Sequence, residues 1–322
     1  MKFQLLPIFL VFAHLICFSI CADYSIVDNN EVNDLISTES LIQLFQKWKT
    51  QHKKAYEPHE EHKRLTIFGK NLKYVLQHNR KSKISGSGHQ VGLNNFADLT
   101  NEEFRHKYLS KVTGRNRKLA ERPRTGRDDL TCEAPAALDW RRKGVVTGIK
   151  NQGQCGSCWA FSAIGAIESI NAINTGDLIS LSEQELVDCD SYVEGCDGGT
   201  MDSAFEWVIN NEGVDSESNY PYTSSNGTEG SCNWTKEKTR VVSIDGYYDV
   251  EQSDSALLCA VVQQPVSVGI DASQIDFQLY SGGIYDGKCS SDPDDIDHAV
   301  LIVGYGSSGT PSKDYWIVKN SW

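Results

Sequence analysis

Apolar residues recur at helical spacing soon after the first forty residues of the chain. Steps of three and four residues, typical of one face of an amphipathic helix, separate Leu41, Leu44, Phe45 and Trp48. A second stripe with this spacing contains Glu60, Arg64, Phe68, Asn71, Val75 and Asn79. Charged and amide side chains on one face with Phe and Val need fixed partners when they are buried. The pattern from Leu41 to Asn79 therefore predicts helical structure whose second stripe holds a polar network.

After this helical region, the spacing of the pattern changes from three or four residues to two. Gly92, Asn94, Phe96 and Asp98 alternate with other residues, and this period of two predicts a short strand. The sequence Thr-Asn-Glu-Glu begins at Thr100 and has the form of a capping box, so a further short helix should start there.

In the second half of the chain, the residue pattern predicts helices first and strands later. The helical segments are expected at 157–174, 180–188 and 200–211. From Val241 onward β-branched and aromatic residues dominate, and the expected strands are 265–270, 298–303 and 315–319. A helical part followed by a strand-rich part predicts an α+β fold of two packed subdomains, with a functional site in the cleft between them.

The N-terminus has the pattern of a secretory signal peptide over residues 1–22. Lys2 precedes an apolar run from Leu5 to Ile20, and small residues follow near Cys21 and Ala22. A membrane anchor is the alternative, but the run is short for a bilayer and contains Pro7 and His14. We therefore expect entry into the secretory pathway and no membrane span once the signal is removed.

Charge divides the remaining chain into two parts. Residues 23–131 contain 20 basic and 14 acidic side chains, whereas residues 132–322 contain 10 basic and 29 acidic ones. Parts of opposite net charge attract each other, although ordinary surface variation is the alternative. An acidic second part also disfavours nucleic acid as a partner, because it cannot neutralise phosphates.

A basic segment lies between the two parts. Residues 110–133 contain many Lys and Arg residues together with Pro123 and two glycines, and they lack the apolar residues of a core. Such an exposed linker is a natural site of proteolysis. Cleavage there would separate residues 23–133 from a second domain at 134–322.

Two distant residues suggest nucleophilic catalysis. Cys158 lies at the start of the helix predicted from 157, where free N–H groups and the helix dipole stabilise a thiolate. His298 is the only histidine after His106, so it is the only imidazole that the second domain can use as a base. A buried structural role for His298 is the alternative.

The motifs around these residues resemble those of papain-like cysteine proteases, and of plant members in particular. They are Gln152-Gly-Gln-Cys155-Gly-Ser-Cys158-Trp159, Asp297-His298-Ala299 and Lys319-Asn320-Ser321-Trp322. The stripe from Glu60 to Asn79, in which Val75 replaces the usual Ile, and the 92–98 segment resemble the two prosegment motifs often written ERFNIN and GNFD. The resemblance covers Leu41 to Trp322. It implies a papain-like fold with a helical and a β-barrel-like subdomain, preceded by a mostly helical inhibitory prosegment.

The resemblance also implies a role for each site residue. Cys158 is the nucleophile, His298 the base, Asn320 the residue that orients His298, and Gln152 an oxyanion donor. Trp322 shields the bond between His298 and Asn320. The remaining substrate-binding positions are Gly198, Gly199, Thr200, Met201, Gly269, Asp297 and Ala299. The residues that the resemblance places at the S2 subsite are small or apolar, and they predict a preference for substrates with an apolar side chain at P2.

Eight of the ten cysteines remain after signal removal. The resemblance implies the disulfides Cys155–Cys196 and Cys189–Cys232, with Cys158 free and with the partner of Cys289 beyond Trp322. Cys132 and Cys259 are additions to the family pattern, and we expect them to pair. A buried apolar thiol at Cys259 is the alternative.

Other functions are disfavoured by the sequence. Cys155 and Cys158 form a C-x-x-C, but no second such pair accompanies them, so we expect neither a metal site nor a cofactor. A non-catalytic relative that keeps the fold, and an inhibitor built on the prosegment, are the remaining alternatives. Both are disfavoured by the presence of Cys158, His298, Asn320 and Gln152 together.

We expect a monomer that acts on proteins and peptides and is inhibited by its own prosegment and by cystatin-type proteins. Its destination is the vacuole, the lysosome or the extracellular space. Asn226-Gly-Thr and Asn233-Trp-Thr are candidate glycosylation sites. The prosegment should leave on acidification, because protonated carboxylates no longer pair with its basic residues.

Overall fold

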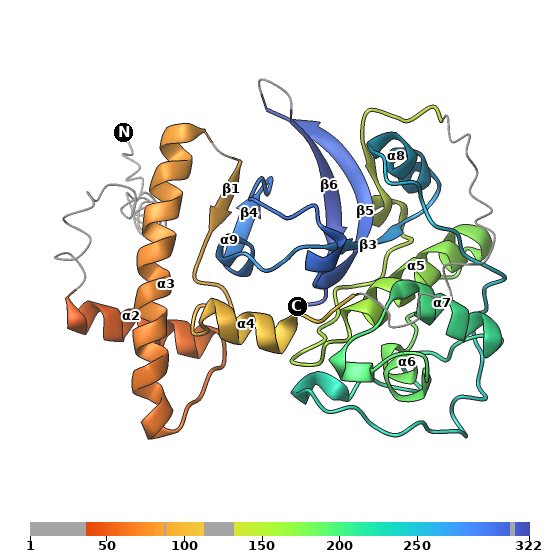
Figure 1. The fold of residues 1–322 in the computed structure, drawn as a ribbon, viewed down its shortest axis with the longest axis horizontal. Coiled ribbons are helices and arrows are strands. Elements are labelled where there is room, and N and C mark those ends of the chain that lie inside the picture. Colours follow the sequence, from red (N-terminus) through yellow and green to blue (C-terminus); the bar gives the residue numbers. More distant parts are fainter. Residues whose placement is uncertain (1–36, 87, 113–131, 310–312) are drawn as a thin grey trace, which may run out of the picture. The chain divides into compact units, whose positions relative to one another are not determined.

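A computed structural model describes residues 37–86, 88–112, 132–309 and 313–322. The predicted signal peptide and most of the basic linker lie outside these residues. The chain forms two compact units (Figure 1), which we call unit one (Met1–Leu99 and Leu279–Asp286) and unit two (Thr100–Gln278 and Gly287–Trp322). Within the described residues, no helix is both long and apolar enough to cross a membrane.

Unit one contains two helices and a two-stranded sheet. The helices are α2 (Thr38–Gln51) and α3 (Pro58–Ser85), and the antiparallel strands are β1 (His89–Val91) and β4 (Tyr280–Gly283). The rings of Phe45, Trp48 and Phe68 form the core between α2 and α3, with centroids 5.2–6.0 Å apart. The helical structure predicted over 41–79 is thus two helices, because Pro58 begins the second one and fits its first turn.

The polar stripe of α3 is bonded to the chain that follows β1. Arg64 Nη1 donates to Asp98 O at 3.1 Å, and Asn71 Nδ2 donates to the carbonyls of Ala97 and Leu99 at 2.8 and 2.9 Å. Asn79 exchanges two hydrogen bonds with the backbone of Val91. The predicted polar network is confirmed, and it fixes this irregular segment against the helix.

The predicted strand over 92–98 is wrong. These residues form successive turns, in which Ala97 N donates to Asn94 O and Leu99 N donates to Phe96 O. The Asn94 side chain adds a bond from Phe96 N to its Oδ1. Asn and Gly favour turns, and turn bonds satisfy backbone groups that a strand would pair with a neighbour.

Unit two begins with α4 (Asn101–Tyr108), which carries the predicted capping box between Thr100 and Glu103. Its longest helix is α5 (Cys158–Thr175), which is buried over most of its length. The other helices of unit two are α6 (Glu183–Cys189), α7 (Met201–Asn210), α8 (Asp254–Gln263) and α9 (Ile275–Gln278), with short 3₁₀ turns at Trp140–Lys143, Gly195–Asp197, Ser224–Asn226 and Pro293–Asp295.

The sheet of unit two is antiparallel and centred on its longest strand. β5 (His298–Ser308) pairs with β2 (Leu138–Asp139), β3 (Val266–Ile270) and β6 (Lys313–Lys319). α8 was not predicted, since residues 241–264 were expected to be strand-rich. Its sequence is apolar almost throughout, and such a short apolar run does not distinguish a buried helix from a strand.

Two apolar clusters build unit two. One joins α5, α6 and α7 through residues such as Trp159, Leu186 and Val208, and the other joins the sheet to α8 through Trp140, Val261 and others. A third cluster with Ala166, Leu301 and Val303 connects α5 to β5. These apolar contacts pack the middle of α5 against β5.

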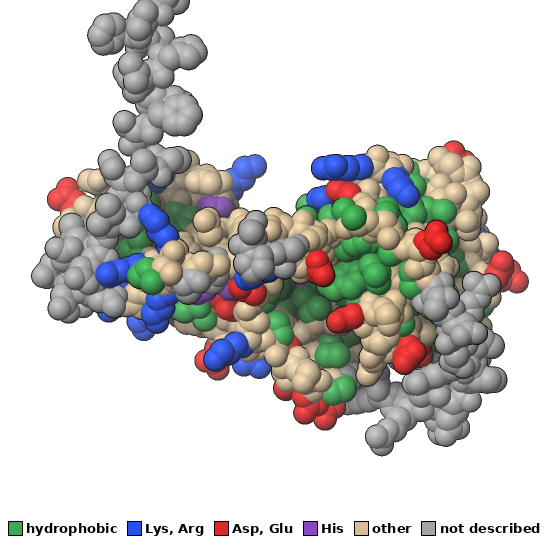
Figure 2. All heavy atoms as spheres, turned by 90° about the horizontal axis from the view of Figure 1, so that it is seen from above, with side chains coloured by type: hydrophobic (Ala, Val, Ile, Leu, Met, Phe, Trp, Pro, Cys, Tyr) green, Lys and Arg blue, Asp and Glu red, His purple; other side chains and the backbone are tan. Residues whose placement is uncertain are grey.

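Charge in the described surface is dispersed. Figure 2 shows several Lys and Arg side chains over the unit-one part of the drawn face, and several Asp and Glu side chains over the unit-two part. The acidic side chains are scattered among apolar and polar ones, so on this face they do not form a single patch.

Candidate active site

The start of α5 presents a fully buried thiol. Cys158 is the first residue of the helix and has no exposed surface. Burial raises the pKa of its thiol, while a hydrogen bond with the Ser110 side chain and contacts with the backbone N–H groups of Ala299 and Trp159 lower it. The thiol is free, since the structure joins the other cysteines near it in disulfides.

The start of β5 presents an imidazole to the same region. His298 is the first residue of the strand and is fully buried, and the neighbouring Ala299 supplies an amide to the Cys158 thiol. Burial lowers the pKa of His298 to about 4, against a hydrogen bond to Asn320 that raises it. The imidazole is therefore neutral in this structure near pH 7.

Asn320 fixes the orientation of the imidazole. Its Oδ1 accepts a hydrogen bond of 2.8 Å from His298 Nε2. Because an amide oxygen only accepts, Nε2 carries the proton and Nδ1 is the basic nitrogen. Trp322 stacks on the imidazole with ring centroids 4.4 Å apart and covers this pair.

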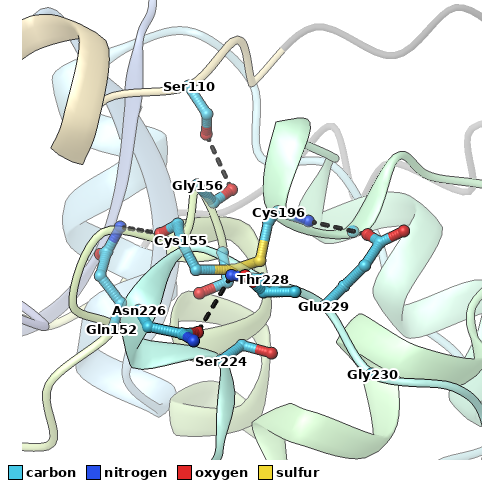
Figure 3. Close-up of a disulfide and its surroundings, with 12 residues drawn as sticks. Ser110, Gln152, Cys155, Gly156, Cys196, Ser224, Asn226, Thr228, Glu229 and Gly230 are labelled. Carbon is cyan, nitrogen blue, oxygen red and sulfur yellow. Dashed lines mark hydrogen bonds between the residues drawn. A yellow bond between two sulfur atoms is a disulfide. The ribbon is translucent and has the colours of Figure 1, made fainter.

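Gln152 lies in the turn before α5 and is fully buried. Its Oε1 accepts from the Ser321 hydroxyl at 2.7 Å. Its Nε2 donates to Tyr108 O at 3.4 Å and to Cys155 O at 3.0 Å, the bond drawn in Figure 3. Both printed bonds of the side-chain Nε2 thus go to backbone carbonyl oxygens, one of them in the segment before residue 112.

Residues 108–111 cross these groups as a strap. Ser110 N donates to Asp297 O at 3.0 Å, and Lys111 forms a parallel bridge with Gly198. The Ser110 hydroxyl donates to Gly156 O at 2.9 Å (Figure 3) and lies 3.5 Å from Cys158 Sγ. Among the described residues no hydrogen bond links Cys158 to His298, and the nitrogen Nδ1 of His298 has no described partner. The hydrogen-bond partner of the Cys158 side chain among the described side chains is therefore Ser110, and not His298.

The other predicted substrate residues line the same region of unit two. Gly269 pairs with Ala299 between β3 and β5, Thr200 caps α7 and Met201 is its first residue. A Cβ at Gly199 would come within 2.7 Å of the Trp159 ring, and one at Gly198 within 2.7 Å of Lys111 O. Only glycine allows the Trp159 ring to approach so closely at Gly199, and the backbone of Lys111 at Gly198.

Sequence reasoning missed the strap residues and the aromatic contacts of α4. Phe104 is fully buried and meets Trp322 edge-to-face at 5.2 Å, while Phe277 meets it at 5.8 Å. Neither Phe104 nor Ser110 carries a motif, so only the three-dimensional structure could reveal them.

It also missed a buried charge cluster behind the site. Lys150 Nζ lies 2.7 Å from Glu183 and 3.2 Å from Glu168, and Lys319 Nζ lies 3.9 Å from Glu168. Burial lowers the pKa of Lys150, but Glu183 and Glu168 together outweigh burial and raise it. These ion pairs connect α5 and α6 to the end of β6, immediately before Asn320.

The structure contains three disulfides, at the pairs expected from the sequence: Cys132–Cys259, Cys155–Cys196 and Cys189–Cys232. The Cα atoms of Cys132 and Cys259 lie 5.5 Å apart, so the pair meets the normal geometry of such a bond.

Comparisons with known proteins agree with this geometry. Residues 134–322 match the family described as papain family cysteine protease, and residues 45–104 match the cathepsin propeptide inhibitor domain. The chain is 48% identical over 304 residues to the cysteine protease XCP2 of Arabidopsis thaliana, covering 93% of this chain and 82% of the relative. It is 47% identical over 296 residues to vignain of Vigna mungo, covering 90% and 78%.

Solved structures of similar precursors support the same fold. The proform of the ragweed pollen cysteine protease Amb a 11 superimposes with a TM-score of 0.78 at 37% identity, covering 92% of this chain and 88% of that one. The recombinant stem bromelain precursor gives a TM-score of 0.77 at 35% identity, covering 88% and 87%.

Proposed function

Because this chain belongs to the papain family of cysteine proteases and carries the family's inhibitory propeptide domain, we propose that Cys158, His298, Asn320 and Gln152 are its catalytic residues. The protein is a cysteine endopeptidase made as an inactive precursor, and the propeptide is its intramolecular inhibitor. The observation that best supports the residue roles is the 2.8 Å bond between His298 Nε2 and Asn320 Oδ1, which leaves Nδ1 as the base on the strand beside the thiol.

The reaction follows from these positions once the strap has left. The Cys158 thiol transfers its proton to His298 Nδ1, and the thiolate attacks the peptide carbonyl. Gln152 Nε2 and the Cys158 backbone N–H stabilise the oxyanion. His298 then gives the proton to the leaving amine, and water hydrolyses the thioester. Asn320 and Trp322 keep the imidazole oriented throughout.

An active-site titration tests this function. We expect an epoxide inhibitor of thiol proteases to label the acid-treated protein with one equivalent, and the untreated precursor much more slowly. The Cys158→Ala variant should take up no label and hydrolyse no peptide. Labelling of Cys158 without peptide hydrolysis would favour the non-catalytic relative, and inhibition of a related protease by the intact chain would favour the inhibitor.

The substrate-binding residues support a preference for apolar P2 side chains. Thr200, Met201, Gly269 and Ala299 carry no charge, and a Cβ at Gly269 would meet Ile296 Cγ2 at 2.7 Å, so the site offers an apolar surface without a counter-ion for a basic residue. Gly198, Gly199 and Asp297 O would bind the substrate backbone. Peptides with Leu, Val or Phe at P2 should be cleaved faster than matched peptides with Arg, and comparable rates would contradict this preference.

Activation is proposed to occur by acid-triggered release of the prosegment and cleavage within residues 110–133. Precursor incubated at pH 4.5 should mature faster than precursor at pH 7.5. The Cys158→Ala variant should not process itself at either pH, and processing at the wild-type rate in that variant would contradict self-cleavage.

We further propose that the protein follows the secretory pathway to the vacuole, the lysosome or the extracellular space. It should act as a monomer that cystatin-type proteins can inhibit. Asn226 and Asn233 are exposed, which supports glycosylation at both positions. To test glycosylation, the mass of the protein would be measured before and after endoglycosidase treatment. We expect the mass to fall on treatment, and each share of this shift to be lost in the Thr228→Ala and Thr235→Ala variants.

A further inference from the structure

One segment of the peptidase sequence belongs to unit one. Residues 134–322 match the papain family, yet Leu279–Asp286 packs with the prosegment residues of unit one. Within this unit β4 pairs with β1 as a two-stranded antiparallel sheet (Figure 1), and no other strand of the described residues pairs with β4. The prosegment therefore meets this part of the peptidase sequence by strand addition.

Backbone hydrogen bonds hold the two strands whatever their side chains are. Gly92 N donates to Leu279 O at 2.8 Å, and Ile284 N donates to Gly88 O at 2.9 Å. A Cβ at Gly88 would lie 2.8 Å from Ile284 O, so this close approach favours glycine there. In strand addition the main-chain bonds give affinity, whereas side chains give specificity. Selectivity at this contact must therefore come from a side chain.

His89 and Asp286 make a polar side-chain contact across the two strands. His89 is 4% exposed, and its Nδ1 lies 2.7 Å from Asp286 Oδ1. An ionised carboxylate only accepts, so Nδ1 carries the proton. The second carboxylate oxygen, Oδ2, accepts from Gly88 N at 3.2 Å. The rings of His78 and Tyr285 pack against the imidazole, each with its centroid 4.8 Å away.

We propose that Asp286 is the residue by which the peptidase domain recognises its own prosegment. Its carboxylate binds two donors at once, the ring N–H of His89 and the backbone N–H of Gly88. Hydrogen bonds to an ionised group are stronger than those between neutral groups. A strand with an apolar side chain at position 89 would leave Asp286 Oδ1 without the ring donor. The proposal goes beyond the proposed function, because Asp286 is not one of the four residues to which that function assigns the chemistry.

Hydrogen–deuterium exchange in the full chain at neutral pH tests this recognition. The Cys158→Ala background removes the proposed nucleophile, so the chain cannot process itself. The amides of Gly92 and Ile284 should exchange when β1 and β4 separate. His89→Phe keeps a ring and removes the donor, and Asp286→Asn removes the charge and one acceptor oxygen. Either change should accelerate exchange at both amides about ten- to one-hundredfold.

A double variant and a charge control separate recognition from general weakening. In His89→Phe/Asp286→Asn the remaining amide oxygen can accept from Gly88 N, so exchange should be no faster than in His89→Phe alone. Asp295→Asn removes the same charge from an exposed position of the peptidase sequence and should exchange at the wild-type rate. Single effects that multiply in the double variant, or unchanged exchange in both single variants, would overturn the proposal.

Peptide hydrolysis after prosegment removal distinguishes recognition from support of the fold. In the chain that retains Cys158, processed Asp286→Asn should have the wild-type kcat and KM, because its partner His89 has left with the prosegment. A loss of kcat there as large as the gain in exchange would overturn the proposal. Should His89→Phe fail to fold, Asp286→Asn decides alone, since unchanged exchange in that variant would also overturn it.

Exchange also keeps this test apart from that of the proposed function, because it does not depend on catalysis. A wild-type chain that hydrolyses no peptide would defeat the function. The exchange rates of Gly92 and Ile284 would still decide the role of Asp286.

Discussion

At the scale of single residues, the site is built from groups whose charge is suppressed by burial. Cys158 and His298 are both fully buried, and burial shifts the pKa of each towards its neutral form. An active papain-like pair needs the opposite, a thiolate beside an imidazolium. Burial in this structure therefore favours the neutral thiol and the neutral imidazole over the charged pair.

The first prediction concerns His298 and acid. Its pKa in the folded state is about 4, below the ordinary 6.5, so the unfolded chain binds a proton more readily between these values. The stabilisation from a neutral His298 is present above pH 6.5 and is lost as the pH falls towards 4, a loss of about 3 kcal/mol. Denaturant unfolding of the Cys158→Ala precursor should show this fall in the free energy of unfolding between pH 6.5 and pH 4. When His298→Gln is added to that variant, the free energy of unfolding should depend less on pH over the same range.

The second prediction concerns Glu185, which the catalytic mechanism does not use. Its Oε2 accepts a 2.6 Å bond from Asp215 N, and burial raises its pKa to about 8. The folded state thus retains a proton that the unfolded chain loses above pH 4.5, and stability falls as the pH rises from 4.5 to 8. Glu185→Gln should raise the free energy of unfolding by about 1–2 kcal/mol at pH 8 and change it little at pH 4.5. If Glu185→Gln changed the free energy of unfolding equally at pH 4.5 and pH 8, the retained proton on Glu185 could not be the cause.

At the scale of elements, α4 contacts residues of unit two that we propose to be catalytic or to cover them. The capping box at Thr100 starts this helix, and Asn101 Nδ2 donates to Ser273 O at 3.0 Å. Phe104 then meets Trp322, which itself stacks on His298. The helix thus reaches His298 through Trp322, and the strap at Ser110 lies against Cys158.

The third prediction follows from this contact. Phe104→Ala removes a fully buried ring, a change that typically costs about 3–5 kcal/mol. The weakened helix should expose Cys158 more often, so epoxide labelling of the precursor at neutral pH should accelerate at least about tenfold. His106→Ala on the exposed face of α4 is the control and should label at the wild-type rate. Equal rates for both variants would show that α4 does not restrain the site.

The sequence predicted elements best where one local pattern dominated. The helix at 157–174 is α5 within one residue at each end, and the strand at 298–303 is the first half of β5. The extension of β5 to Ser308 depends on pairing with β6, which is long-range. The proposed site residues with motifs could be named in advance, but Ser110 and Phe104 contact residues that are distant in the sequence, and no local pattern marks them.

At the scale of the whole molecule, covalent bonds and ion pairs tie distant segments of unit two together. Cys132–Cys259 spans 127 residues and joins the beginning of the second domain to α8. The charge cluster around Lys150 joins α5 and α6 to β6. Sequence charge alone could not locate this cluster, because its members come from four separated segments.

The fourth prediction concerns that long disulfide. A cross-link closing so large a loop restricts the unfolded chain strongly, and its removal should lower stability by about 3–5 kcal/mol. Cys132→Ser/Cys259→Ser should therefore unfold at a lower temperature in calorimetry than the Cys158→Ser control, in which no disulfide is lost. Identical melting of the two variants would contradict a structural role.

The same bond decides what a peptide cut can separate. Residue 132 is bonded to α8, so a break on its N-terminal side frees everything upstream, whereas a break just after it leaves the two fragments joined through sulfur. Electrophoresis without a reducing agent would then display a single band of undiminished mass, although the backbone had been severed. Whether the inhibitor departs or stays attached thus depends on which side of one cysteine the processing protease strikes.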